Sequence, residues 1–389
     1  MAPKNNSPLP LQEALNLVKI PSSGETRRFM GTRSAYLPGS DFDEEKGIPS
    51  VHSAAFGGHV YAQSVLAASQ AWRELEDERG TTPTERLGFH TITGYFTRPG
   101  NPSRPFIYNV TPLTASRTFS TLSVTAYQPS QPSSNPEKDH FPLADASLPL
   151  APPSFTAICS FKLPEPHSQG VSIQEAPPQE RFSEILASRP PLAWPPAPPV
   201  DITGIVELAG SDQEGKFPIA KMRKVDMTVY NEGRPMHEKR ELLLYKLLRP
   251  LPPPAVASEE GVTIEGKEPG GDRPWWADTS AHVAAHAYVA DRNGLLVVGN
   301  HAGFGHAFGR AASLNYTLVV HVNADEAVMH GSVEEGDGDD GGWWVQEMFF
   351  PRVAAGRGIV ESKIWSPSGV HVATEYQDGL VQGMGLGKL

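Results

Sequence analysis

Three things are scarce in this sequence of 389 residues: cysteine, long apolar runs and positive charge. The single cysteine, Cys159, cannot form an intramolecular disulfide, which is typical of a reducing compartment. No apolar stretch of about 18 residues is present, which argues against a transmembrane helix, and the N-terminus MAPKNNSPLPLQ lacks the apolar core of a secretion signal. The formal net charge of -11 argues against nucleic acid or an anionic membrane as a general partner. The net charge does not exclude a local basic pocket that binds a phosphorylated ligand.

The sequence also lacks several motifs of well-known catalytic sites. There is no Gly-x-Ser-x-Gly elbow, which disfavours a serine hydrolase of the α/β type. His282 and His286 have helical spacing, but Val283 stands where a zinc protease has glutamate, so both histidines are expected to be structural or exposed. No Lys-Ser/Thr pair follows the run GFGHAFG (303–309), so it is not a phosphate loop. Cys159 has no adjacent histidine and is expected to be a buried thiol.

The apolar pattern predicts the same order of elements twice. Residues 57–78 have apolar side chains at helical spacing, and residues 280–298 predict a second long helix. Each is followed by β-branched and aromatic runs typical of antiparallel strands, at 88–127 and 155–163, and then from 313 to 380. Further strands are expected at 217–230 and 237–249 and a short helix at 10–19, while residues 20–55 are polar and punctuated by glycine and proline. The fold class is therefore α+β, with each helix on a curved sheet and the two sheets able to join edge to edge.

Proline-rich segments suggest how the chain divides into domains. The expected N-terminal unit is 1–163, with a flexible Pro/Ser-rich insertion at 128–153. A Pro-rich linker at 164–216 leads to a C-terminal unit at 217–389. The acidic runs DFDEEK and EEGDGDDGG are expected to be solvated loops.

Five segments together resemble the type II acyl-CoA thioesterases: FGGHVYAQ, FTRPG, HVAAHAYVADRNGLL, AASLNYTLVVH and VATEYQDGL. The resemblance implies a double hot dog fold, in which two long helices are each wrapped by a curved antiparallel sheet. It also implies hydrolysis of acyl-CoA to a free acid and CoA without metal or cofactor, in a homodimer or higher homo-oligomer. The C-terminal Gly-Lys-Leu is an imperfect form of the peroxisomal Ser-Lys-Leu signal, so a peroxisomal or cytoplasmic location is expected.

By position, the resemblance assigns catalysis to Asp291, Ser313 and Gln377. The chemistry of these residues suits the assignment, because a carboxylate can take a proton from water while a hydroxyl and a carboxamide hold that water. The apolar surroundings of Asp291 are expected to raise its pKa. The expected substrate-binding residues are at the start of the first long helix and in the FTRPG turn, where Arg98 could meet a CoA phosphate or only shape the turn: Gly57, Gly58, His59 and Arg98. A backbone N–H is expected to stabilise the oxyanion.

Two departures from the family pattern keep other functions open. Leu314–Leu318 replaces the usual Asp-His-Ser-Met-Trp, and His59 stands where glutamine is usual. One alternative is a hot dog enoyl-CoA hydratase or dehydratase, which needs paired aspartate and histidine on one helix. His286 lies five residues before Asp291, which is a poor spacing for that pair. The other alternative is a non-catalytic acyl-CoA-binding module.

Overall fold

The computed structural model describes residues 8–40, 54–82, 85–135, 140–166, 170–209, 216–251, 274–303, 308–329 and 342–383. The acidic run DFDEEK, nearly all of EEGDGDDGG, His306 and the C-terminal Gly-Lys-Leu lie outside these residues. The solvated acidic loops and the imperfect peroxisomal signal therefore stay predictions. Of the helices within the described ranges, none has the length and apolar character needed to cross a membrane.

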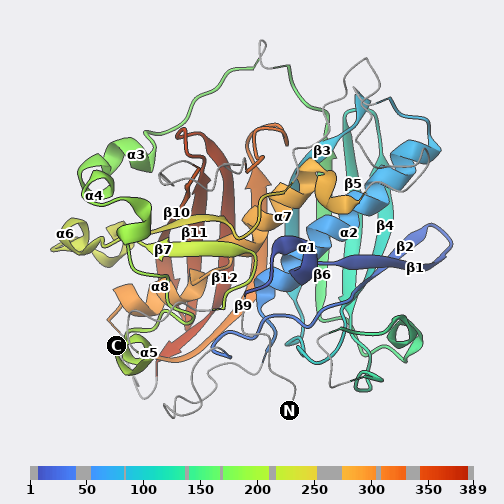
Figure 1. The fold of residues 1–389 in the computed structure, drawn as a ribbon, viewed down its shortest axis with the longest axis horizontal. Helices are drawn as coiled ribbons and strands as arrows, with labels where there is room; N and C mark the ends of the chain where they lie inside the picture. The colour runs from blue at the N-terminus through green and yellow to red at the C-terminus, as the bar shows by residue number, and fades with distance from the viewer. Residues whose placement is uncertain are drawn as a thin grey trace.

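Each half of the chain contributes two strands, a helical segment and four more strands (Figure 1). The first half consists of α1 (Leu11–Ala14), β1 (Leu17–Ser23), β2 (Thr26–Gly31), α2 (Gly57–Glu78), β3 (Gly88–Phe96), β4 (Ile107–Ala115), β5 (Phe119–Tyr127), η3 (Leu143–Ser147) and β6 (Phe155–Lys162). Between the halves come α3 (Pro178–Arg181), α4 (Ser183–Ala187), η4 (Pro191–Ala193) and α5 (Thr203–Ala209). The second half consists of β7 (Ala220–Lys224), α6 (Thr228–Asn231), η5 (Met236–Glu238), β8 (Glu241–Leu247), η6 (Trp275–Ala277), α7 (Thr279–Ala290), α8 (Gly294–His301), β9 (Phe308–Val320), β10 (Trp344–Ala354), β11 (Arg357–Trp365) and β12 (His371–Gly383).

All described strands form one 12-stranded antiparallel sheet in the order β1-β2-β4-β5-β6-β3-β9-β12-β11-β10-β8-β7. The order is the same when it is read from either end, with β1 to β6 of the first half replaced by β7 to β12 of the second. The halves meet where β3 pairs with β9, from Thr91 opposite Val319 to Tyr95 opposite Asn315. This continuous sheet confirms the predicted α+β double hot dog architecture with its two sheets joined edge to edge.

The two main helices pack against each other on one face of the sheet (Figure 1). All residues of α7 from Ser280 to Ala290 are buried, and so are those of α2 from Gly58 to Ala68. Many of these side chains are alanine or glycine, so the two backbones approach closely. A Cβ on Gly58 would lie only 2.9 Å from the carbonyl oxygen of Tyr288. The contact between the helices therefore joins the start of α2 to the end of α7.

The prediction of one continuous helix at 280–298 is wrong in one respect that bears on function. The helix is broken: α7 ends at Ala290, and α8 begins at Gly294. Asn293 between them has φ 61°, a left-handed conformation that asparagine tolerates better than most residues. The apolar pattern continues through the break and so does not reveal it. The break leaves Asp291 in a turn.

Two local predictions near the chain's other segments are also corrected. The helix predicted at 10–19 is limited to α1, and the β1–β2 hairpin begins within that range at Leu17 and continues into the polar segment 20–55, turning at Gly24 with φ +58°. The strand predicted at 217–230 is β7 followed by α6. Strand pairing accounts for the strands that form here, since β2 pairs with the distant β4 and β7 with β8.

The two proline-rich segments are packed against the sheet rather than free of it. In the segment predicted as a linker, Phe182 and Trp194 are buried in a core cluster with Trp365. In the insertion predicted to be flexible, the buried Asp145 accepts hydrogen bonds from the side chains of Ser133 and Ser134. The domain boundaries 1–163, 164–216 and 217–389 stay a prediction.

Candidate active site

The turn between α7 and α8 places Asp291 against the start of α2. The backbone N–H of Gly58 donates a hydrogen bond to Oδ2 of Asp291 over 2.5 Å. The first N–H groups of an α-helix have no acceptor within the helix, and the helix dipole favours negative charge there. No side chain of α2 itself caps this end. The carboxyl group of Asp291, from the second half of the chain, therefore caps the main helix of the first half.

The glycines at the start of α2 make this approach possible. A Cβ on Gly57 would lie 3.1 Å from Oδ2 of Asp291, tighter than ordinary contact. A Cβ on Gly58 would lie 2.5 Å from the ring of Phe56, in addition to its close approach to Tyr288. Any larger residue would push the helix end away from the carboxylate, so both glycines are explained by packing around Asp291.

Gln377 of β12 connects the carboxylate to two hydroxyl groups. Its Nε2 lies 3.1 Å from Oδ1 of Asp291 and 2.8 Å from Oγ of Ser313, and it also contacts the hydroxyl of Tyr316. The Ser313 and Tyr316 hydroxyls are 2.9 Å apart. An amide nitrogen carries two protons and here meets three acceptors, so one of these contacts is free to be exchanged for a water molecule.

A bulge in β9 brings both hydroxyls to the same face of the sheet. Gln377 pairs with Tyr316, Asp378 with Asn315 and Gly379 with Ser313, so Leu314 is left without a partner. In a regular strand, residues 313 and 316 would point to opposite faces. The extra residue reverses that alternation. The segment that departs from the family pattern therefore supplies the bulge and a buried tyrosine to the site.

Gly294, the first residue of α8, fits closely under the side chain of Gln377. A Cβ at this position would overlap Oε1 of Gln377. Within the described part of the chain, this oxygen is buried and has no hydrogen-bond partner. The glycine thus fixes the orientation of the amide and leaves an acceptor available.

Burial controls the charge of the aspartate. It raises the pKa of Asp291 from the ordinary value of 3.8 to about 8, while the hydrogen bonds from Gly58 and Gln377 lower it by less. The carboxyl is therefore largely protonated at neutral pH. It becomes a base under mildly alkaline conditions, or when a ligand changes its surroundings.

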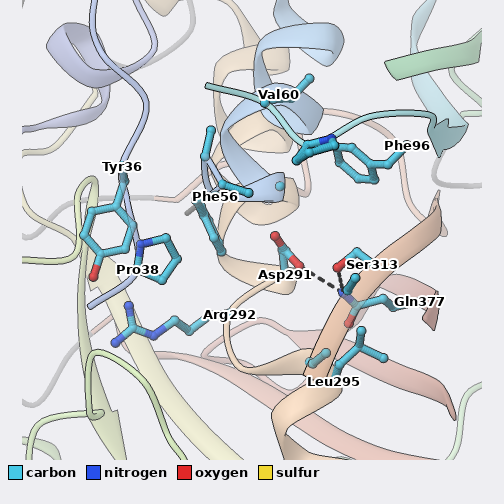
Figure 2. A pocket seen from close by; sticks show the side chains of 18 of the residues that line it. Tyr36, Pro38, Phe56, Val60, Phe96, Asp291, Arg292, Leu295, Ser313 and Gln377 are labelled. Atoms are coloured by element: carbon cyan, nitrogen blue, oxygen red, sulfur yellow. Dashed lines mark hydrogen bonds between the residues drawn. The ribbon is translucent and has the colours of Figure 1, made fainter. Parts of the chain in front are cut away.

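A cavity of about 440 Å³ opens onto this cluster (Figure 2). Its walls are mostly apolar and include Phe56, Val60, Phe96 and Leu295, while Asp291, Ser313 and Gln377 lie together at one side. The size is within the range of small-molecule sites, roughly 300–1,000 Å³.

The four residues predicted to bind substrate differ in position. Gly57 lines the cavity, and Arg98 lines it at an exposed place. Gly58 reaches the site through its N–H bond to Asp291. His59 is buried between the rings of Phe106 and Tyr288 and does not line the cavity, and burial lowers its pKa to about 4. The predicted role of His59 in substrate binding therefore has no support from its position.

The remaining chemically notable residues lie away from the cavity. Cys159 is buried in β6, and burial raises the pKa of its thiol. The ring nitrogens of His286 are 2.8 Å from the Tyr245 hydroxyl and 2.8 Å from the Ala327 carbonyl oxygen, which is a structural role. Among the described residues, no group of three His, Cys, Asp or Glu side chains is arranged to hold a metal ion.

Tyr316 and Gly294 take part in the site but could not be predicted as site residues. Nothing in the residue types near them indicates a role, because their positions depend on the β9–β12 register and on the break after α7. Arg292 and Asn293 also line the cavity. The prediction of a continuous helix at 280–298 did not indicate this position for them.

Comparisons with known proteins agree with the fold that carries these residues. A family model described as the acyl-CoA thioesterase N-terminal domain matches residues 45–138, and one described as the acyl-CoA thioesterase C-terminal domain matches residues 263–381. Together they span more than half of the chain. Human acyl-coenzyme A thioesterase 8 is 22% identical over 332 residues, which are 84% of this chain and 80% of the human protein.

Solved structures are similar over nearly the whole chain. Acyl-CoA thioesterase II TesB2 from Mycobacterium marinum has a TM-score of 0.54 and 18% identity, covering 97% of this chain and 99% of its own. The tesB protein of Mycobacterium avium has a TM-score of 0.50 and 18% identity, covering 96% of this chain and 98% of its own. At this identity the similarity concerns the fold.

Proposed function

Since the chain belongs to the acyl-CoA thioesterase family in its double hot dog form, we propose that it hydrolyses acyl-CoA thioesters with a water molecule held by Asp291, Ser313 and Gln377. The observation that carries this proposal is the meeting of a carboxyl, a carboxamide and a hydroxyl at one side of an apolar cavity. The products are a free acid and CoA. Metal and cofactor play no part in the proposal.

In the proposed mechanism, the ionised Asp291 accepts a proton from the bound water. The water oxygen then attacks the thioester carbon and forms a tetrahedral oxyanion. The oxyanion collapses, the C–S bond breaks, and the CoA sulfur leaves with the proton returned by Asp291. The Gln377 amide and the Ser313 hydroxyl orient the water, since their existing contacts can each be exchanged for one to water.

The start of α2 is the proposed stabiliser of the oxyanion. Gly57 lines the cavity, and its N–H is among those that the first turn of a helix leaves without an intrahelical acceptor. The positive end of the helix dipole adds to the attraction for negative charge. A thioester carbonyl placed beside Gly57 would therefore lie next to the water on Asp291.

Arg98 is the proposed contact for a CoA phosphate. It lines the cavity at an exposed place, where the polar end of the substrate would remain in solvent. Guanidinium groups match phosphate geometry well. The homodimer or higher oligomer expected from the family resemblance remains a prediction.

The two alternative functions have less support. A hydratase would need a second acid or base beside Asp291, and the nearest candidate on α7, His286, has both ring nitrogens engaged by Tyr245 and Ala327. A non-catalytic binding module would not need the contacts among Asp291, Gln377 and Ser313, which are present in the structure.

The proposal is tested by release of free thiol from a panel of acyl-CoA esters. We expect turnover with the wild-type protein and a loss of about 10²- to 10⁴-fold in Asp291→Ala, as for removal of a general base. Glu375→Gln is a control for loss of a buried carboxyl, because Glu375 is fully buried on β12 and interacts electrostatically with Asp291 but makes no hydrogen bond to Asp291, Ser313 or Gln377. Wild-type-like turnover by a folded Asp291→Ala protein would refute the assignment.

A further inference from the structure

Part of the cavity wall comes from the proline-rich stretch between the two halves of the chain. We name this segment, residues 195–202, the strap. Its first part runs along the edge strand β7, where the N–H of Ala197 donates to the carbonyl oxygen of Met222 over 3.1 Å. Pro199 and Val200 then line the cavity. The position of the strap therefore decides how closely the cavity is enclosed on this side.

Side chains from other elements hold the second part of the strap. Four of its eight residues are proline, which has no N–H to donate to a sheet. Nη2 of Arg292 donates to the carbonyl oxygen of Pro198 over 2.6 Å. Asn300 of α8 donates to the carbonyl oxygen of Asp201 over 2.7 Å. The Asp201 carboxylate also forms a salt bridge with Lys224 of β7, so an ionic contact fastens the strap to the sheet.

A second carboxyl shares that lysine. Oε2 of Glu241 on β8 lies 3.5 Å from Nζ of Lys224, and both Glu241 and Asp201 are only 4% exposed. Burial raises the pKa of Glu241 from 4.5 to about 7, while Lys224 opposes this shift and the Asp201 carboxyl adds to it. Burial lowers the pKa of Lys224, but the two carboxyls raise it more, so it lies above the ordinary 10.5. Near neutral pH the cluster therefore changes from one negative charge to two, against the single charge of the lysine.

The neighbouring elements leave this charge balance to Lys224. His301 of α8 acts on the same cluster, but burial and nearby cations lower its pKa to about 4, so it is neutral when Glu241 titrates. Arg240 precedes Glu241 on the opposite face of the sheet and pairs there with the buried Glu347. On the other side of β8, the residue of β10 opposite the glutamate is an uncharged methionine.

We propose that Asp201, Lys224 and Glu241 form a pH-sensitive clasp, which holds the strap on the cavity at acidic pH and releases it at alkaline pH. Ionised Glu241 competes with Asp201 for one ammonium group and repels the second carboxylate. Glu241 and Lys224 belong to paired strands, so Asp201 is the member that yields. The proton on Glu241 thus favours the closed strap, and this preference is lost as pH rises through about 7. The clasp is separate from the hydrolytic step, and takes from the proposed function only that acyl-CoA occupies the cavity.

Binding measured without turnover tests the clasp. Every protein would carry Asp291→Asn, which removes the titration of the carboxyl at the centre of the site. The ligand is a non-hydrolysable thioether analogue of hexanoyl-CoA, and calorimetry gives its Kd. From pH 6 to pH 8.5, the Kd should rise at least threefold more with Glu241 than with Glu241→Gln, because glutamine stays neutral. Asp201→Asn should weaken binding at both pH values. Glu76→Gln is the matched control: Glu76 is a buried acid of α2 whose pKa burial also raises, and its loss should leave the pH dependence unchanged.

Hydrogen exchange reports whether the strap itself moves. The N–H of Ile202 donates to the Val200 carbonyl over 3.0 Å, and the N–H of Val206, just beyond the strap, donates to the Ile202 carbonyl over 2.9 Å. Both amides should exchange at least threefold faster with Glu241 than with Glu241→Gln at pH 8.5, and equally at pH 6. Equal exchange, or an equal Kd, for the two proteins at both pH values would overturn the clasp, whatever the thiol-release assay shows. The expected binding and exchange in a protein that releases no thiol would support the clasp and contradict the thioesterase proposal.

Discussion

Replacing Asp291 by asparagine should abolish turnover and, at alkaline pH, make the protein more stable. The reason is that burial raises the pKa of this carboxyl to about 8, against 3.8 for an ordinary aspartate. Between these two pH values the folded state holds a proton that the unfolded state does not. The stability of the wild-type protein therefore falls as pH rises from about 4 to about 8, and stays low above that. An asparagine has no such dependence.

The magnitude follows from the two pKa values. One pKa unit corresponds to 1.36 kcal/mol. Relative to acidic pH, the free energy of unfolding of the wild-type protein therefore falls by roughly 5 to 6 kcal/mol at pH 9 and by about 1 to 2 kcal/mol at pH 5. Asparagine keeps an oxygen for the Gly58 N–H but opposes the Gln377 amide with its own nitrogen, which costs about 1 kcal/mol. The variant should therefore gain about 4 kcal/mol at pH 9 and almost nothing at pH 5.

Calorimetric unfolding of both proteins from pH 5 to pH 9 measures this difference. For a chain of 389 residues, 1 kcal/mol corresponds to about 1 °C in Tm, so a gain near 4 °C is expected at pH 9. Glu375→Gln should also gain stability at alkaline pH, since burial raises the pKa of that carboxyl, but it should keep turnover. An Asp291→Asn protein whose Tm difference from wild type does not grow with pH would show that the carboxyl is not desolvated as argued.

The same carboxyl should make kcat/KM rise with pH, about tenfold per pH unit below an apparent pKa near 8, and a flat profile from pH 5 to 9 would exclude Asp291 as the base. Gly294→Ala should lower kcat by roughly 10- to 100-fold because its Cβ displaces the Gln377 amide, whereas Gly170→Ala, with open space around it, should not; equal rates for the two variants would contradict this packing. Tyr316→Phe should lower kcat by about tenfold through loss of the hydroxyl that contacts Gln377 and Ser313, while unchanged kinetics would mean that the hydroxyl does not orient the site.

Much of the fold could be predicted because its helices and strands carry their own apolar periodicity. The helix at 57–78 and the strands that follow it are as the pattern indicates. The break after Ala290 could not be predicted, because the apolar pattern of α7 continues through Leu295, Val297 and Val298. These three residues of α8 are buried like those of α7. The β1–β2 hairpin was missed because its pairing with β4 joins residues about 80 positions apart.

The residues of the candidate site were predicted from the family resemblance more than from residue chemistry. Asp291, Ser313 and Gln377 are far apart in the sequence, and only the β9–β12 pairing and the α7–α8 turn bring them together. The Leu314 bulge, which turns Ser313 and Tyr316 to one face, depends on strand register and has no signal in composition. The expected role of His59 illustrates the opposite case, in which a residue inside a matching motif points into the core.

The most direct test of the central claim is the fate of labelled water. The wild-type protein would be incubated with acyl-CoA and 2-enoyl-CoA esters in water enriched in oxygen-18, and the products would be identified by mass spectrometry. Hydrolysis at Asp291 predicts a free acid with one labelled oxygen, together with unlabelled CoA, and the loss of both in Asp291→Asn. A labelled hydroxyacyl-CoA with its thioester intact, or unchanged substrate across the panel, would contradict the proposed function.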